Sequence, residues 1–242
     1  GGDRCGSGAN DRVRKGRELM AAIISFMGLD GSGKSTSIEI SREYLEKAGE
    51  PVEVVRAAYV VEYMRPFLEF GKRILLKKDS NPFGGDYKAY LEKMRAATKK
   101  GPIYGLYQAC TNIEFKAQIR NRVVRKNRKG INLLVDRYIY DNVVTYAANT
   151  DQGLDFMLER LDGVWRDAPK PDLIIYIKTP VEVCMSRKND IPDPLYLEVR
   201  ESRYDALAEE LGATVISGSQ PYDDMAKEVV SAVSSAVNRR KQ

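Results

Sequence analysis

The sequence predicts an α/β fold with three layers, in which a five-stranded parallel sheet is flanked by helices. Short runs rich in Val, Ile and Leu alternate with longer amphipathic stretches, and such runs are typical of strands buried on both faces. The chain has 242 residues, of which 43% are hydrophobic and 30% charged, so it can bury one large core. We therefore expect residues 20–242 to form a single domain.

The predicted elements follow one another with turn or cap signals between them. The strands are expected at residues 22–27, 52–56, 131–135, 173–177 and 213–216. Helical length and spacing occur at residues 35–48, 60–77, 104–126, 154–165, 181–187, 195–211 and 225–238. Gly49, Gly130 and Gly212 stand where helices should end. Residues 78–85 contain Asp-Ser-Asn-Pro and Gly-Gly, and we interpret them as a loop.

The composition excludes several kinds of chemistry. The chain has no histidine, which rules out His-based triads and His-ligated zinc. Its three cysteines are widely spaced, so neither a disulfide framework nor a zinc site is expected, and a reducing cytoplasm fits best. The net charge of +5 mildly favours anionic ligands. No apolar run approaches the roughly 20 residues that span a bilayer, so no membrane segment is expected.

The first 19 residues differ in character from the rest. They are rich in Gly, Arg and Asp, and they lack both a starting Met and the apolar core of a signal peptide. We interpret residues 1–19 as a disordered extension or a remnant foreign to the domain.

A phosphate-binding loop follows the first predicted strand. The stretch Gly28-Leu-Asp-Gly-Ser-Gly-Lys-Ser-Thr36 matches the pattern Gly-x-x-x-x-Gly-Lys-[Ser/Thr] and leads into a helix. The glycines allow backbone N–H groups to surround phosphate oxygens, and the helix N-terminus favours negative charge. The alternative is a glycine-rich turn that only caps the helix. The expected ATP-binding residues are Gly28, Asp30, Gly31, Ser32, Gly33, Lys34, Ser35 and Thr36, with Lys34 on the β- and γ-phosphates and Ser35 on Mg²⁺.

A second motif, Asp136-Arg137-Tyr138, closes the strand expected at residues 131–135. Ligands of open parallel sheets bind at the carboxyl ends of the strands, where the phosphate-binding loop also lies. An acid there is suited to holding Mg²⁺ or its waters, although strand-end acids also serve as helix caps or pair with a surface Arg. We expect Asp136 to be a metal ligand together with Ser35.

On these motifs the sequence resembles the thymidylate kinase family of P-loop nucleoside monophosphate kinases. Two further stretches carry the resemblance: Pro171-Asp172 with the apolar strand after it, and the Thr179-Pro180 segment whose helix ends at Arg187. The resemblance implies a P-loop kinase fold, an acceptor-binding region at about residues 57–130 and a lid at about residues 187–194. It also implies that Asp30 contacts the acceptor sugar, Arg137 a phosphate, and Arg187 the base and phosphates of ATP. Related enzymes are often dimers, so a homodimer is one expectation.

The acceptor half departs from the family pattern. The family has Arg-Glu-Pro-Gly after the second strand, whereas this chain has Arg56-Ala-Ala-Tyr59, which keeps the Arg and loses the turn. The family's base-reading Arg, one turn after an aromatic residue, is missing after Tyr107. Tyr107 is expected either in the core or beside a planar acceptor. The acceptor-binding candidates are Asp30, Arg56, Arg73, Tyr107, Arg137, Tyr138 and Asp141.

Three functions are compatible with these residues. The first is ATP- and Mg²⁺-dependent phosphoryl transfer to a nucleoside monophosphate, dTMP by resemblance, with Lys34, Asp136, Arg137 and Arg187 as the catalytic set. The second is phosphorylation of a hydroxyl on a deoxynucleoside, sugar or other small molecule, with Asp141 or Asp30 as the base. The third is a nucleotide-binding switch, which is disfavoured because the chain has no Asn-Lys-x-Asp motif.

A basic cluster precedes Gly130. Cations complement a helix C-terminus, and no aromatic residues interleave with these as a single-stranded nucleic acid would require. We therefore predict a solvated helix face and no nucleic acid partner. The cluster consists of Arg120, Arg122, Arg125, Lys126, Arg128 and Lys129.

Overall fold

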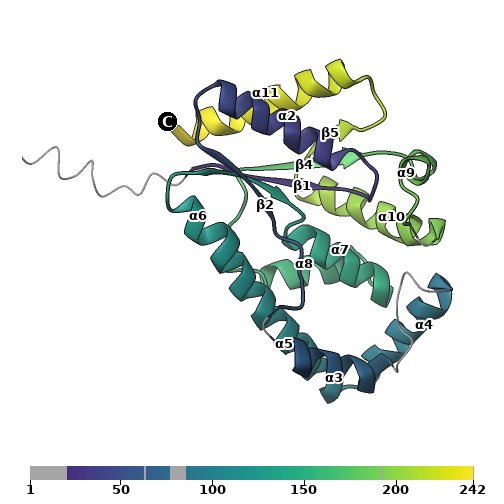
Figure 1. Cartoon of the computed structure of the whole chain (residues 1–242). Coiled ribbons are helices and arrows are strands. Elements are labelled where there is room, and N and C mark those ends of the chain that lie inside the picture. The colour runs from purple at the N-terminus through teal and green to yellow at the C-terminus, as the bar shows by residue number, and fades with distance from the viewer. Residues whose placement is uncertain (1–20, 63, 77–85, 192, 242) are drawn as a thin grey trace, which may run out of the picture.

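Five parallel strands form one sheet at the centre of the computed structural model, which describes residues 21–62, 64–76, 86–191 and 193–241 (Figure 1). The sheet order is β2-β3-β1-β4-β5. The strands are β1 (Ile23–Met27), β2 (Val52–Arg56), β3 (Asn132–Asp136), β4 (Leu173–Lys178) and β5 (Thr214–Ser217). All five predicted strands are confirmed, as is the parallel sheet. The predictions for residues 1–19 and 78–85 lie outside the described residues.

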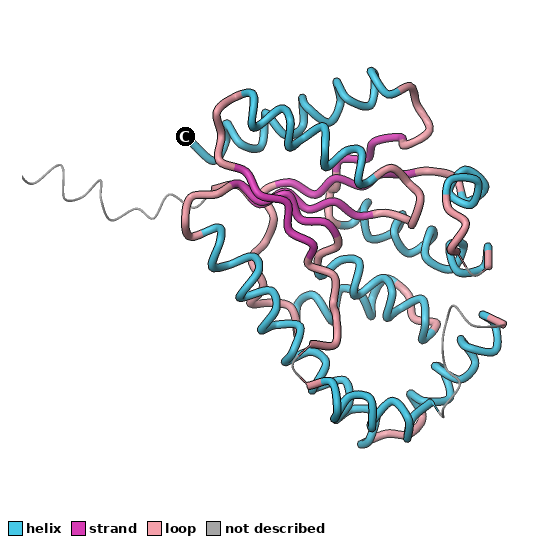
Figure 2. Tube along the Cα trace, viewed as in Figure 1, coloured by secondary structure: helices cyan, strands magenta, loops and turns pink. Residues whose placement is uncertain are grey.

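Helices cover both faces of the sheet and give the three predicted layers (Figure 2). Helices α2 (Lys34–Lys47) and α11 (Tyr222–Lys241) lie on one side. Those on the other side include α5 (Pro102–Ile119), α7 (Ile139–Thr150), α8 (Leu154–Asp162) and α10 (Pro194–Glu210). The remaining helical elements are α3 (Arg65–Leu76), α4 (Tyr87–Thr98), the π-helical turn η1 (Arg120–Val124), α6 (Arg125–Asn127) and α9 (Val181–Arg187). None of the helices in the described part of the chain is long and apolar enough to cross a membrane.

The helices α4 and α7 were not predicted. Most of α7 is buried, and Asp141 is its only charged residue, so no charged face marks this stretch as a surface helix. Helix α4 begins after Asp86, whose side chain accepts hydrogen bonds from the N–H groups of Lys88 and Ala89. That capping residue was the available signal for α4. The helix predicted at residues 60–77 begins only at Arg65.

Alternate side chains of the strands pack into two separate hydrophobic cores, one on each face of the sheet. Ile24 and Phe26 of β1 pack with α2 and α11, whereas Ile23 and Met27 pack with helices of the opposite layer. All four side chains are at most 4% exposed. This alternation is the period of two that a strand imposes on its side chains. The central strand is therefore buried on both faces, as the apolar run predicted.

The register of the sheet brings the motifs together. Asp136 at the end of β3 lies opposite Phe26 of β1 and opposite Arg56 at the end of β2. The phosphate-binding loop begins two residues after Phe26. The carboxyl ends of these three strands therefore share one edge, where open α/β sheets bind their ligands.

At the amino ends of the strands, the buried side chain of Asn132 links neighbouring segments through hydrogen bonds. Its Oδ1 accepts a hydrogen bond from the N–H of Ala22 at 3.0 Å, and its Nδ2 donates to the carbonyl of Pro51 at 3.1 Å. Replacing Asn132 by Ala would leave the N–H of Ala22 without this partner, whereas the carbonyl of Pro51 would keep the bond from the backbone N–H of residue 132 at 2.8 Å. We expect Asn132→Ala to lower the free energy of unfolding by about 1–3 kcal/mol, measured by urea denaturation.

The matched control for this prediction is Asn238→Ala, because Asn238 is exposed near the end of α11. Its free energy of unfolding should change by less than about 0.5 kcal/mol. Equal unfolding midpoints for the two variants would contradict the role assigned to Asn132.

Candidate functional site

The loop between β1 and α2 packs directly against neighbouring backbone. Gly28 and Gly31 have φ values of 142° and 84°, which side-chain-bearing residues rarely adopt. A Cβ atom at Gly28 would lie 2.6 Å from the carbonyl oxygen of Ile177, and one at Gly31 would lie 2.6 Å from that of Cys184. The hydroxyl of Ser32 is buried without a hydrogen-bond partner among the described residues. The loop is therefore closely packed, and the Ser32 hydroxyl is available to hydrogen-bond a phosphate group.

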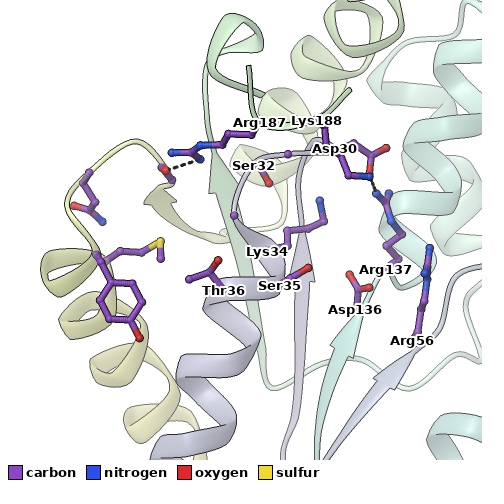
Figure 3. Close-up of a pocket in the computed structure, with 16 residues that line it drawn as sticks. Asp30, Ser32, Lys34, Ser35, Thr36, Arg56, Asp136, Arg137, Arg187 and Lys188 are labelled. Atoms are coloured by element: carbon purple, nitrogen blue, oxygen red, sulfur yellow. Dashed lines mark hydrogen bonds and ion pairs between the residues drawn. The ribbon is translucent and has the colours of Figure 1, made fainter. Parts of the chain in front are cut away.

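Lys34 reaches back into this loop (Figure 3). Its Nζ donates to the carbonyl oxygens of Gly28 at 2.9 Å and Leu29 at 2.6 Å. Burial, together with the positive charge of Arg137, lowers the pKa of Lys34 to about 8. The ammonium group is thus held by weak neutral acceptors, and a phosphate oxygen would be a stronger partner for it.

A pocket of about 590 Å³ opens beside the loop at the carboxyl edge of the sheet. Five of its lining side chains are cationic and two are carboxylates, so the pocket favours an anionic ligand. The described residues that line it are Asp30, Gly31, Ser32, Gly33, Lys34, Ser35, Thr36, Arg56, Asp136, Arg137, Arg187, Lys188, Gly218, Gln220, Tyr222 and Met225.

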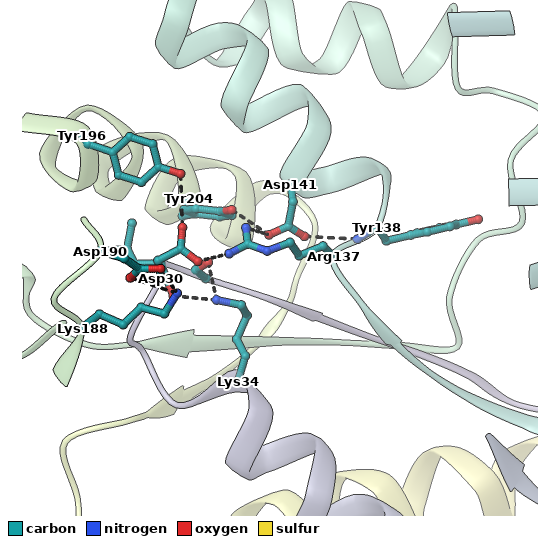
Figure 4. A network of polar contacts seen from close by, with 11 residues as sticks. Asp30, Lys34, Arg137, Tyr138, Asp141, Lys188, Asp190, Tyr196 and Tyr204 are labelled. Atoms are coloured by element: carbon teal, nitrogen blue, oxygen red, sulfur yellow. Dashed lines mark hydrogen bonds and ion pairs between the residues drawn. The ribbon is translucent and has the colours of Figure 1, made fainter. Parts of the chain in front are cut away.

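Arg137 stands between two carboxylates (Figure 4). It forms an ion pair with Asp30, and its Nη1 lies 3.7 Å from Oδ1 of Asp141. Burial disfavours the charged guanidinium, but the attraction of these carboxylates outweighs it and raises the pKa of Arg137. Burial likewise opposes ionisation of Asp30, yet the charges of Arg137 and Lys34 lower the pKa of that carboxyl. The backbone of Arg137 has a φ of 58°, a strained value that the surrounding contacts maintain.

Asp141 lies beneath Arg137 and is 4% exposed. It accepts hydrogen bonds from the Tyr204 hydroxyl at 2.7 Å and from the N–H of Tyr138 at 3.2 Å. Burial raises the pKa of Asp141, although Arg137 opposes this effect. Asp141 is therefore placed to orient Arg137 rather than to face the pocket.

The model of the thymidylate kinase family matches residues 64–229, which is more than half of the chain. The chain belongs to the thymidylate kinase family. It is similar to the thymidylate kinase of Fervidobacterium nodosum, with 24% identity over 217 residues that cover 86% of this chain and 96% of that protein. It is also similar to the probable thymidylate kinase of Archaeoglobus fulgidus, at 24% identity over 90% of this chain and 98% of that protein. The thymidylate kinase of Citrifermentans bemidjiense is 27% identical over 69% of this chain and 64% of its own length.

Membership of this family makes the chain a thymidylate kinase-like phosphotransferase and agrees with the P-loop kinase fold that the motifs predicted. The matched region begins after the phosphate-binding loop, so the family model and the loop motif are separate observations.

In this structure, most of the predicted site residues lie together. Lys34, Ser35, Arg56, Asp136 and Arg137 line one pocket, and Arg187 joins them from α9. Their roles stay predictions. Gly28 supports the loop from beneath and is not in the lining.

Other predicted residues lie elsewhere. The ring of Tyr138 is 1% exposed, and its hydroxyl donates to the carbonyl of Pro169 at 2.9 Å, away from the pocket. Tyr107 lies against Gly71 of α3 and does not line the pocket. The side chain of Arg73 lies outside the described residues.

The segment after β5 also belongs to the site, although no sequence motif marks it. Gly218, Gln220, Tyr222 and Met225 line the pocket, and the carbonyl of Gly218 accepts a hydrogen bond from Nη1 of Arg187 at 3.0 Å. The available signal was the position of these residues, because the carboxyl end of every parallel strand meets the same edge.

No preformed metal centre exists among the described residues, where no three His, Cys, Asp or Glu side chains gather. Mg²⁺ in phosphoryl-transfer sites typically needs only one or two protein oxygens, since phosphates and waters supply the rest. The exposed hydroxyl of Ser35 and the carboxylate of Asp136, which line one pocket, fit that requirement.

Gly218 provides a test of the loop packing. A Cβ there would lie 2.1 Å from the backbone oxygen of Ser32 and 2.2 Å from Oγ1 of Thr179. We expect Gly218→Ala to displace the phosphate-binding loop and to raise the KM for ATP by about tenfold or more, measured by steady-state kinetics.

Gly105→Ala is the control, because a Cβ at this helical glycine meets no atom within 4 Å. Its KM for ATP should stay at the wild-type value. Indistinguishable KM values for the two variants would mean that the loop tolerates the added methyl group.

Proposed function

We propose that this chain transfers the γ-phosphoryl group of ATP to a nucleoside monophosphate, with dTMP as the acceptor that the family implies. The observation that carries the proposal is the arrangement of cations around the phosphate-binding loop. Arg56 and Arg137 lie on one side of Lys34, and Arg187 lies on the other (Figure 3). An acceptor that carries its own phosphate needs such guanidinium groups, because Arg can hold a phosphate through two hydrogen bonds.

The donor would lie on the loop side of the pocket. Its phosphates would meet Lys34, the Ser32 hydroxyl and the backbone N–H groups at the start of α2. Its base would extend toward Arg187, Gln220 and Tyr222, which come from the segments after β4 and β5. The proposed lid over residues 187–194 begins at this Arg187.

Ser35 and Asp136 would hold Mg²⁺ in this arrangement, and bound Mg²⁺ neutralises charge on the phosphates during transfer. Arg137 would contact the acceptor phosphate or the transferred group. Its ion pair with Asp30 and its contact with Asp141 hold the guanidinium in place before substrates bind. Such prior orientation lowers the reorganisation that the reaction requires.

The alternative, a hydroxyl acceptor, would need a free carboxylate as base. Asp141 is buried with a tyrosine hydroxyl and a backbone N–H as partners, and Asp30 is paired with Arg137. These contacts favour the monophosphate acceptor. The homodimer stays a prediction.

The decisive experiment is an acceptor panel of dTMP, dUMP, dCMP, thymidine and simple sugars, assayed by ATP consumption. We expect dTMP to be phosphorylated but poorly distinguished from other pyrimidine monophosphates, because the family's base-reading Arg is missing after Tyr107. Arg56→Ala should raise the KM for the acceptor by about tenfold or more and leave the KM for ATP nearly unchanged.

Arg239→Ala, at an exposed position near the end of α11, is the matched control and should change neither KM. Turnover of thymidine or a sugar but of no monophosphate, with loss of that activity in Asp141→Asn, would establish the hydroxyl kinase instead.

Metal dependence tests the role of Asp136 separately. Asp136→Asn keeps the shape of the side chain and removes its charge, so the Mg²⁺ concentration for half-maximal rate should rise by about tenfold. Asp224→Asn, exposed at the start of α11, is the control. An unchanged Mg²⁺ requirement in Asp136→Asn would reduce this residue to a structural cap.

A further inference from the structure

A second pocket, of about 410 Å³, lies in the helical layer that contains α5. It is formed by the end of α5, the turn η1, α6 and the segment before β4. This helical stretch runs along β2: Arg122 donates to the carbonyl of Arg56 at the end of that strand, and Lys126 pairs with Glu53 near its start. No residue is shared between the linings of the two pockets. The described residues that line it are Lys116, Ile119, Arg120, Val124, Arg125, Arg128, Trp165, Asp167, Ala168 and Pro169.

The π-helical turn η1 explains why four cations face one pocket. In a regular α-helix, with about 100° per residue, Lys116 and Arg125 would point in opposite directions. In η1 the N–H of Arg125 bonds to the carbonyl of Arg120, five residues earlier, so the wider turn absorbs one residue. Arg125 and Arg128 are thereby rotated onto the face that carries Lys116 and Arg120. π-helical turns of this kind occur frequently at functional sites.

These four cations differ from their neighbours in having no acidic partner. Arg122 pairs with Glu62 at 2.8 Å, and Lys126 pairs with Glu53. Within the described ranges, none of Lys116, Arg120, Arg125 and Arg128 forms an ion pair, and one carboxylate, that of Asp167, lines the pocket. The four unpaired cations are all exposed, as the predicted solvated face requires, and they line the pocket, whereas Arg122 and Lys126 are paired with glutamates.

The opposite wall supplies apolar surface and a further donor. Trp165 is 2% exposed and packs edge-on against Phe115, with ring centroids 4.9 Å apart. Its Nε1–H has no acceptor among the described residues. Ile119, Val124, Ala168 and Pro169 complete the wall. The pocket thus offers one buried donor without an acceptor, the Nε1–H of Trp165, beside four exposed cations, and a ligand that fits these donors must supply acceptors.

We propose that this pocket is a second ligand site that binds a nucleotide, with its phosphates on the four cations and its ring against the apolar wall. Three guanidinium groups on one face suit phosphate oxygens, which Arg binds through paired hydrogen bonds. The volume lies within the range of small-molecule sites. The site stands apart from the proposed phosphoryl transfer, because none of its residues belongs to the phosphate-binding loop or the Asp136-Arg137 motif.

The test uses Trp165, which is the only tryptophan of the chain and so reports on this pocket directly. ATP is titrated while tryptophan fluorescence is followed, and calorimetry counts the ATP molecules bound per chain. Two variants separate the sites: Lys34→Ala weakens the phosphate-binding loop, and the double variant Arg120→Ala with Arg125→Ala weakens the second pocket. The double variant Lys47→Ala with Arg239→Ala, exposed on α2 and α11, matches the loss of two positive charges.

We expect two ATP molecules per wild-type chain. The fluorescence change should persist in Lys34→Ala and in the charge-matched control, and its midpoint should rise by about tenfold or more in Arg120→Ala with Arg125→Ala. Pyrophosphate, which has no ring, should bind the second pocket at least about tenfold more weakly than ATP. The thermal midpoint of each variant verifies that it remains folded.

One ATP per wild-type chain would overturn the proposal. A fluorescence change that vanishes in Lys34→Ala and survives in Arg120→Ala with Arg125→Ala would do the same, because the signal would then come from the phosphate-binding loop. Pyrophosphate binding as tightly as ATP would overturn the assignment of the apolar wall to a ring. Failure of these tests leaves the proposed phosphoryl transfer untouched, since that activity is measured by acceptor turnover.

Discussion

The parallel pairing of β1 with β3 and β4 is the constraint on which the rest of this structure depends. Parallel strands end at a common edge, so every segment that follows a strand is delivered to the same place. The phosphate-binding loop after β1, Asp136 at the end of β3 and Arg187 after β4 meet there although they are far apart in the chain. Gly218 after β5 completes the edge, because the absence of a side chain lets its backbone lie against Ser32.

Electrostatics at this edge are arranged around Arg137. Two carboxylates keep the guanidinium charged despite its burial, and the same charge holds Asp30 ionised. Lys34 has no carboxylate within ion-pair distance among the described residues and donates to backbone carbonyls, which leaves it with the weakest partners of the group. An incoming phosphate would therefore gain most from Lys34, whereas Arg137 is already oriented. The site thus combines the oriented guanidinium of Arg137 with the ammonium group of Lys34, whose hydrogen bonds to backbone carbonyls a phosphate could replace.

The two cationic pockets bring their positive charges together in different ways. At the carboxyl edge, cations come from several loops that the strands bring together. In the second pocket, the four cations come from one continuous helical stretch, and a π-helical turn rotates them onto a common face. Both arrangements leave donors in excess, which is the condition for binding phosphates.

The sequence by itself determined the features that depend on neighbouring residues: the five strands, the glycine-rich loop, and the acid and arginine that end β3. An apolar run or a glycine spacing acts locally, so it is readable without the fold. Only the tertiary structure decided that Asp141 lies beneath Arg137, because its partner Tyr204 is 63 residues away. The tertiary structure also decided that the Tyr138 hydroxyl donates to the carbonyl of Pro169. It likewise decided the direction in which the side chains of the basic cluster point, which depends on one π-helical turn. Side-chain direction follows from packing between distant segments, and no local pattern records those contacts.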